Sequence, residues 1–218
     1  MNDAIIDQLG ELGVIPVIVL DDAEGAVPLA EALLNAGMPA LEVAFRTDAT
    51  ADALGRISRR FPDLLLGAGT VLTVDQARQA GERGARFIIS PGLDAEVVGF
   101  CLDQGLVPLP GVSSPTEIQA ALRLGVDVLK LFPMEALGGL EYLKAVSAPF
   151  PTVRFIPTGG VNTANLADYL TFPRVLACAG TWIARRQWLA EKRFDLIERE
   201  AARVVRTVAE VRQGGDRA

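Results

Sequence analysis

Residues 14–44 read VIPVIVLDDAEGAVPLAEALLNAGMPALEVA, and this stretch contains the repeating unit of the chain. The apolar run over residues 14–20 is rich in valine and isoleucine, which favours a buried strand. Apolar residues then recur at helical spacing over 24–36, and a second apolar run occupies 40–44. Two apolar strands joined by a helix form a parallel unit, so the segment predicts an α/β fold.

The same alternation continues along the rest of the chain. Strands are expected at residues 14–20, 40–44, 64–68, 86–89, 106–109, 126–131, 153–156 and 175–179. Helices are expected at residues 24–36, 49–60, 74–83, 94–104, 114–124 and 140–146, and three of them should stop at Gly37, Gly84 and Gly125. Strand-helix units that recur at intervals of roughly 20–25 residues predict a single (β/α)8 TIM barrel rather than a doubly wound sheet.

The two ends of the chain lie outside this repeat. A short N-terminal helix is expected before the first strand, and a closing helix over residues 194–211 should carry apolar residues on one side. Residues 213–218 are expected to be frayed. The 218 residues, half of them hydrophobic, suffice for one large core, so residues 1–218 are predicted to form one domain.

Composition excludes several classes of function. The net charge is −6, from 21 basic and 27 acidic side chains, and no basic block is present, which disfavours nucleic-acid binding. No apolar run approaches the roughly 20 residues of a spanning helix, and the N-terminus lacks the pattern of a signal peptide. A cytoplasmic protein without membrane contact is therefore expected. Cys101 and Cys178 have no CxxC spacing and are expected to be buried free thiols.

The chain contains no histidine. It therefore lacks the commonest general base and the commonest zinc ligand, and proton transfer falls to Glu, Asp, Lys or Tyr. A Ser-His-Asp hydrolase and a zinc aldolase are disfavoured, and no carboxylate cluster suggests magnesium. No metal and no organic cofactor are expected, whereas covalent lysine chemistry remains open.

Lys130 interrupts an apolar strand. Strand alternation places Val128, Lys130 and Phe132 on one face, and Leu129 and Leu131 on the other. A lysine in apolar surroundings loses solvation, which lowers its pKa and increases the neutral fraction that can form an imine. The alternative is a lysine whose amine reaches water from the end of the strand.

Glu42 and Arg46 share strand parity at the end of the second predicted strand, so both should face the barrel mouth. Glu42 is a candidate general acid/base, and Arg46 is a candidate bidentate ligand for a substrate carboxylate. The alternative is a structural ion pair between Glu42 and Arg46.

Turns rich in glycine and hydroxyl groups follow other predicted strands. Thr70, in Gly67-Ala68-Gly69-Thr70, is a candidate ligand for the same carboxylate, and Ser90-Pro91-Gly92 ends strand four. The alternative is that each segment is simply a turn between a strand and a helix. The turns after strands seven and eight often form the phosphate site of such barrels. They predict a phosphorylated substrate held by Thr158, Gly159, Gly160, Gly180 and Thr181.

Six motifs occur in the order in which one enzyme family carries them. They are Glu42-Val43-Ala44-Phe45-Arg46-Thr47, Gly67-Ala68-Gly69-Thr70-Val71-Leu72, Ser90-Pro91-Gly92, Pro110-Gly111-Val112-Ser113-Ser114-Pro115-Thr116-Glu117, Lys130-Leu131-Phe132-Pro133 and Pro157-Thr158-Gly159-Gly160-Val161. With these motifs the chain resembles the 2-keto-3-deoxy-6-phosphogluconate (KDPG) aldolase family, also called 4-hydroxy-2-oxoglutarate (KHG) aldolase, over nearly its whole length.

The resemblance implies a class I aldolase that cleaves KDPG to pyruvate and glyceraldehyde 3-phosphate, with cleavage of KHG to pyruvate and glyoxylate as a further activity. It implies that Lys130 forms the Schiff base and Glu42 is the general acid/base. It also implies that Arg46 and Thr70 hold the pyruvyl carboxylate, that Phe132 and Pro91 line the pocket, and that the protein is a homotrimer. Two departures from the family pattern, Ala44 and Ala179, are expected to alter hydrogen bonding at the mouth and the fit of a phosphate.

Two other functions are compatible with these residues. One is a phosphosugar isomerase or epimerase that uses Glu42 as base without a covalent intermediate, and the other is a catalytically silent phosphate-ligand sensor. The sequence does not distinguish gluconate, galactonate and unphosphorylated keto-acid substrates.

Overall fold

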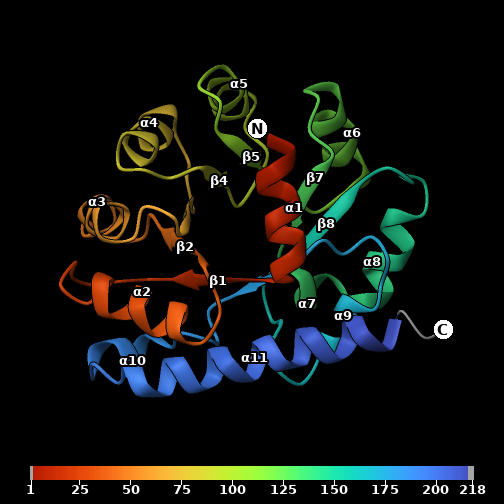
Figure 1. Ribbon diagram of the computed structural model, residues 1–218. Helices are drawn as coiled ribbons and strands as arrows, with labels where there is room; N and C mark the ends of the chain where they lie inside the picture. Colours follow the sequence, from red (N-terminus) through yellow and green to blue (C-terminus); the bar gives the residue numbers. More distant parts are fainter. Residues whose placement is uncertain (1, 216–218) are drawn as a thin grey trace.

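The computed structural model describes residues 2–215 of the chain and shows an α/β fold built on parallel strands (Figure 1). The strands, in chain order, are β1 (Val14–Ile18), β2 (Ala40–Ala44), β3 (Leu65–Gly69), β4 (Phe87–Ile89), β5 (Val107–Leu109), β6 (Gly111–Val112), β7 (Val128–Leu131), β8 (Arg154–Pro157) and β9 (Cys178–Gly180). Each of the eight predicted strand segments overlaps an observed strand.

The strands form a curled parallel sheet in two parts. A six-stranded part has the order β5-β4-β3-β2-β1-β9, and a three-stranded part has the order β6-β7-β8. Isolated parallel bridges join Phe155 to Val175 and Thr158 to Ala179, between the β8 and β9 sides. The short strand β6 was not predicted, so the prediction of eight strands is corrected to nine in the described residues. It is separated from β5 by Pro110, which has no backbone N–H for a strand ladder.

The described part of the chain has eleven helices, and most of them lie around the outside of the curled sheet (Figure 1). They are α1 (Asn2–Leu12), α2 (Ala26–Asn35), α3 (Thr50–Arg60), α4 (Val74–Glu82), α5 (Ala95–Asp103), α6 (Pro115–Arg123), α7 (Met134–Leu137), α8 (Gly139–Ser147), α9 (Leu166–Leu170), α10 (Arg186–Ala190) and α11 (Phe194–Gly215). The short helices α7, α9 and α10 were not predicted. The frayed tail was predicted from residue 213, but α11 includes residues 213–215, and residues 216–218 lie outside the described part.

Local sequence signals explain where several helices begin and end. Thr73, Asp94 and Ser114 accept hydrogen bonds from backbone N–H groups in the first turns of α4, α5 and α6. The predicted glycine stops are confirmed, since Gly37, Gly84 and Gly125 all have positive φ directly after α2, α4 and α6. These ends direct the chain back to the sheet for the next strand.

Alternation along the strands separates two apolar layers. On β2, Leu41 and Val43 pack outward against the helices, whereas Ala40 and Ala44 face the concave side. The concave cluster consists of the buried residues Ile5, Leu9, Ile15, Val17, Ala40, Ala44, Leu65, Phe87, Ile89, Val107, Leu109, Val128, Ile156, Ala177 and Ala179. Glu42 and Lys130 belong to the same strand faces, so the fold brings both side chains to the concave side.

Helix α1 contributes two members of this cluster. Ile5 and Leu9 are buried among concave-face residues, and Gly13 links the helix to the start of β1. In Figure 1, α1 crosses the middle of the ring of strands. It therefore covers the concave face on the side where the strands begin.

The cysteines, the helix lengths and the metal-ligating side chains can also be inspected in the structure. Cys101 and Cys178 are buried and free, as expected. Among the described residues, no helix combines the length and apolar character needed to cross a membrane, and no three His, Cys, Asp or Glu side chains gather in a metal-binding arrangement.

Candidate active site

Lys130 and Glu42 lie buried on the concave face of the sheet. Lys130 is on β7 and is 4% exposed, and Glu42 is on β2 and is fully buried. In register, Lys130 pairs with Gly111 on one side and Ile156 on the other. The predicted inward direction of both side chains is thus what the alternation of the strands produces. The alternative of a lysine that reaches bulk water from the strand end does not fit this burial.

Burial shifts the pKa values of both groups in the direction that favours the neutral form of each side chain. Desolvation lowers the pKa of Lys130, and the Arg46 charge lowers it further, while the Glu42 carboxylate opposes both effects. Desolvation raises the pKa of Glu42, against the opposing charges of Lys130 and Arg46. The two side chains are therefore close enough to influence one another. Both shifts increase the fraction of the neutral form, which is a nucleophile in the amine and a proton donor in the carboxyl group.

Gly69 on the neighbouring strand β3 makes room for Glu42. A Cβ atom at Gly69 would lie 1.5 Å from Glu42 Oε1, so no other residue fits there without displacing the carboxyl group. Among the described residues, neither oxygen of Glu42 has a hydrogen-bond partner. A buried carboxyl group without partners is costly to the folded state and is characteristic of a site where it meets a ligand.

Arg46 contacts Thr70 across the ends of β2 and β3. The Arg46 Nε donates a hydrogen bond of 3.1 Å to Thr70 Oγ1. Thr70 has φ +53°, a conformation that is strained for a β-branched residue and is found most often at functional sites. No ion pair joins Arg46 to Glu42 in the described part of the chain, which counts against the structural ion pair considered above.

Phe132 forms one wall beside Lys130. The Lys130 Nζ lies 5.2 Å from the centroid of the Phe132 ring. A Cβ atom at Gly159 would lie 3.1 Å from Cδ2 of the Phe132 ring. The turn that follows β8 therefore packs against the same ring. The carbonyl of Pro91 lies against Gly111, the register partner of Lys130. The structure therefore gathers Phe132, Gly159 and Pro91 around the lysine.

The predicted phosphate-binding residues lie on two adjoining turns. Thr158 is buried and its hydroxyl donates 3.1 Å to the Ile156 carbonyl, and the following Gly159 and Gly160 both have positive φ. A bridge between Thr158 and Ala179 joins this turn to the turn after β9. In that second turn, a Cβ atom at Gly180 would lie 2.3 Å from the Trp182 ring, and Thr181 is exposed. Gly180 thus packs on an indole ring, while Thr181 faces solvent.

The departures Ala44 and Ala179 lie within the concave apolar cluster. They are 0% and 1% exposed. The methyl group of Ala179 is packed among residues of the concave face, and its effect on a bound phosphate stays a prediction.

Several residues of the site region were not identified from the sequence. Gly69 belongs to a quoted motif, and its inward parity was a usable signal. A hollow of about 390 Å³ also opens beside Arg46 and Thr181, and its lining includes Trp182, Arg185 and Arg186. The adjacent arginines after strand eight were the only sequence sign of it.

Comparisons with known proteins give the family. The KDPG and KHG aldolase family matches residues 5–200. The 2-dehydro-3-deoxy-phosphogluconate aldolase of Treponema pallidum (strain Nichols) is 47% identical over 88% of this chain and 92% of its own length. The KHG/KDPG aldolase of Escherichia coli (strain K12) is 41% identical over 88% of this chain and 90% of its own length.

Solved structures agree. A KDPG aldolase from Legionella pneumophila, with pyruvate captured as a covalent carbinolamine intermediate, has a TM-score of 0.89 and 39% identity, and the match covers 94% of this chain and 98% of that one. The 2-keto-3-deoxy-6-phosphogluconate aldolase of Zymomonas mobilis ZM4 with 3-phosphoglycerate has a TM-score of 0.83 and 37% identity, over 92% and 94% of the two chains. With a family match over most of its length and relatives well above 30% identity, this chain belongs to the KDPG and KHG aldolase family.

Proposed function

We propose that this protein is a class I aldolase, a carbon-carbon lyase that reversibly cleaves KDPG to pyruvate and glyceraldehyde 3-phosphate through an imine on Lys130. The observation that carries the proposal is the buried lysine beside a buried carboxyl group that has no hydrogen-bond partner among residues 2–215. The Legionella relative captured with a carbinolamine of pyruvate supports the same chemistry. Cleavage of KHG to pyruvate and glyoxylate is a second expected activity, consistent with the names of the relatives.

The reaction begins at the substrate keto group. Neutral Lys130 Nζ attacks C2, and loss of water from the carbinolamine gives an iminium ion. The C4 hydroxyl loses its proton, the C3–C4 bond breaks, and its electron pair passes into the iminium, which leaves an enamine and releases the aldehyde. Protonation of C3 and hydrolysis of the imine then free pyruvate and restore Lys130.

Glu42 is the group placed to move these protons. Its raised pKa increases the fraction that carries a proton for dehydration of the carbinolamine and for protonation of the enamine. Arg46 and Thr70, already joined by a hydrogen bond, would hold the pyruvyl carboxylate, with the guanidinium donating. Phe132 and Pro91 would line the pocket, and Thr158, Gly159, Gly160, Gly180 and Thr181 would receive the distal part of the substrate.

Borohydride reduction in the presence of pyruvate tests the imine. Intact mass should show one added pyruvyl group, and peptide mapping should place it on Lys130. Lys144 and Lys192 are internal controls, because both are exposed on the surface. Folded protein without an adduct would rule out the Schiff-base mechanism. Interconversion of a pentose phosphate would then favour the isomerase, and tight phosphate binding without turnover would favour the sensor.

Several broader features rest on the same family membership. We infer that the two parts of the sheet close into a (β/α)8 barrel, which the bridges between the β8 and β9 sides support. One domain over residues 1–218, a homotrimer and a cytoplasmic location remain predictions. Light scattering tests the trimer, and cell fractionation tests the location.

A further inference from the structure

The hollow beside Arg46 lies at the carboxyl ends of three adjacent strands. Its lining comes from the segments that follow β1, β2 and β9, which are neighbours in the order β2-β1-β9. Within the described residues, that lining includes Arg46, Arg185 and Arg186 and contains no carboxylate. Three guanidinium groups surround this concave space of about 390 Å³, and two of them, Arg46 and Arg185, have no carboxylate partner among the described residues, which gives the space a positive potential. The hollow is therefore suited to an anion.

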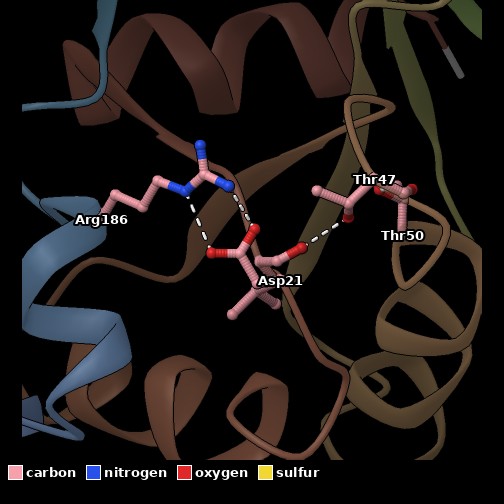
Figure 2. A network of polar contacts seen from close by, with 5 residues as sticks. Asp21, Thr47, Thr50 and Arg186 are labelled. Atoms are coloured by element: carbon pink, nitrogen blue, oxygen red, sulfur yellow. Dashed lines mark hydrogen bonds and ion pairs between the residues drawn. The ribbon is translucent and has the colours of Figure 1, made fainter.

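Asp21 engages only one of these arginines. Arg186 donates from its Nε to Asp21 at 3.0 Å and from a second nitrogen to the other carboxylate oxygen. Figure 2 shows Asp21 between Arg186 and the loop that carries Thr47. The Thr47 hydroxyl donates to the Leu20 carbonyl, so the segments after β1, β2 and β9 are tied together. The Asp21–Arg186 pair fixes the rim of the hollow, and its charge is already balanced.

Arg185 is held by a different contact. Its guanidinium carbon lies 4.8 Å from the centroid of the Trp188 ring, and no carboxylate pairs with it among the described residues. Stacking on an aromatic ring orients the planar group and leaves its N–H donors free. Arg185 is thus an oriented cation on the rim of the hollow.

The hollow also continues from the aldolase site. Arg46 lines it and at the same time acts electrostatically on Lys130 and Glu42. Thr181, a predicted phosphate ligand, lines it as well. A keto acid with a phosphate at its far end has two anionic groups, and this region offers two arginines without carboxylate partners. Arg46 suits the carboxylate close to the lysine, and Arg185 suits the group that lies farther away.

We propose that Arg185, together with Thr181, binds the distal phosphate of the substrate in this hollow and sets the preference for phosphorylated over unphosphorylated keto acids. The proposal rests on the proposed function, and it assigns a role to a residue outside all the motifs described above. Arginine recognises a phosphate through two parallel N–H donors. A lysine at the same place would act only as a point charge.

Steady-state cleavage of two matched substrates tests the proposal. One is KDPG, and the other is the same keto acid without its phosphate. Arg185→Ala should raise KM for KDPG about tenfold or more and change KM for the unphosphorylated compound less than about twofold. Arg185→Lys should recover part of the loss. Arg206→Ala removes the same charge from the exposed side of α11, and should behave as wild type. Equal changes for both substrates, or none, would overturn the proposal.

Binding of inorganic phosphate provides a readout that needs no turnover. Calorimetry should detect weaker phosphate binding in Arg185→Ala than in wild type and in Arg206→Ala, while the pyruvate adduct on Lys130 forms normally in all three. Equal phosphate affinity in all three proteins would contradict the role of Arg185. Absence of the pyruvate adduct from the wild type would instead contradict the aldolase, so the two failures are distinguishable.

Discussion

Two neighbouring levels of the concave face, two residues apart along the strands, differ in chemistry: one is apolar and the other carries the ionisable pair Glu42 and Lys130. Ala40 and Val128 belong to the apolar cluster that also contains Leu9 of α1. Two residues further along the same strands, Glu42 and Lys130 occupy equally buried positions. Because alternation gives both levels the same direction, the strand pattern that builds the core also builds the site. Burial of apolar side chains stabilises the fold, whereas burial of an ionisable pair costs stability, and the proposed function explains why the pair is there.

The largest expected effect on activity comes from replacing the lysine of the polar level with an apolar side chain. Lys130→Met should reduce aldol cleavage by at least about 10⁴-fold, because the covalent route is lost. The melting temperature should not fall, since a desolvated amine is replaced by an apolar chain. Lys130 has a folded-state pKa below its ordinary 10.5, so its charging costs stability below the folded pKa, and this cost disappears as the pH rises toward 10.5. The stability advantage of Lys130→Met should therefore shrink at high pH, as measured by thermal unfolding across pH. Lys144→Met, at an exposed position, is the control.

Glu42→Gln sharpens the comparison, because it retains the shape of the site and removes its proton carrier. Turnover should fall by about 10²- to 10⁴-fold. The carboxylate raises the Lys130 pKa, so its removal should lower that pKa further. The acidic limb of pyruvate trapping by borohydride should then move to lower pH. A limb that stays in place or moves to higher pH would show that the two groups are not coupled.

Leu9→Ala acts at the apolar level. Leu9 is fully buried, so the cavity should cost about 2–5 kcal/mol of unfolding free energy. Turnover per folded molecule should remain that of the wild type at a temperature where both are folded. Denaturant unfolding and active-site titration with pyruvate measure the two quantities. A loss of turnover that exceeds the loss of folded protein would mean that the two levels are not independent.

Thr70→Ala should have the smallest effect of the four. It removes the hydroxyl that accepts from Arg46 and retains a side chain at φ +53°. Loss of one hydrogen bond to a charged group, worth about 1.5–3 kcal/mol, should weaken pyruvate binding by about 10- to 100-fold. Thr70→Ser keeps the hydroxyl and should bind pyruvate like the wild type. Equal binding by all three proteins would remove Thr70 from the carboxylate site.

The sequence predicts this fold well where a signal is local. Apolar runs rich in valine and isoleucine identify the strands, and the parity of Glu42 and Lys130 within them identifies the inward polar pair. The glycine stops follow from the helical period and the need for positive φ.

What the sequence does not predict depends on neighbours far away in the chain. The need for Gly69 arises because β2 lies beside β3 and directs Glu42 at it. Pro110 separates β5 from β6, and only the pairing of these strands with different partners shows that the sheet is divided there. The hollow at Arg185 requires three strand ends to meet, and no single segment contains that information.

Helix α1 has a practical consequence for handling the enzyme. It covers the side of the sheet where the strands begin, whereas Arg46, Thr70 and Thr181 follow strand ends on the opposite side. A tether joined ahead of Asn2 would therefore anchor the protein by the face remote from substrate entry. Enzyme immobilised in this orientation should present its mouth to the flowing solution, and a tag at this end is the suitable choice for a packed-bed reactor.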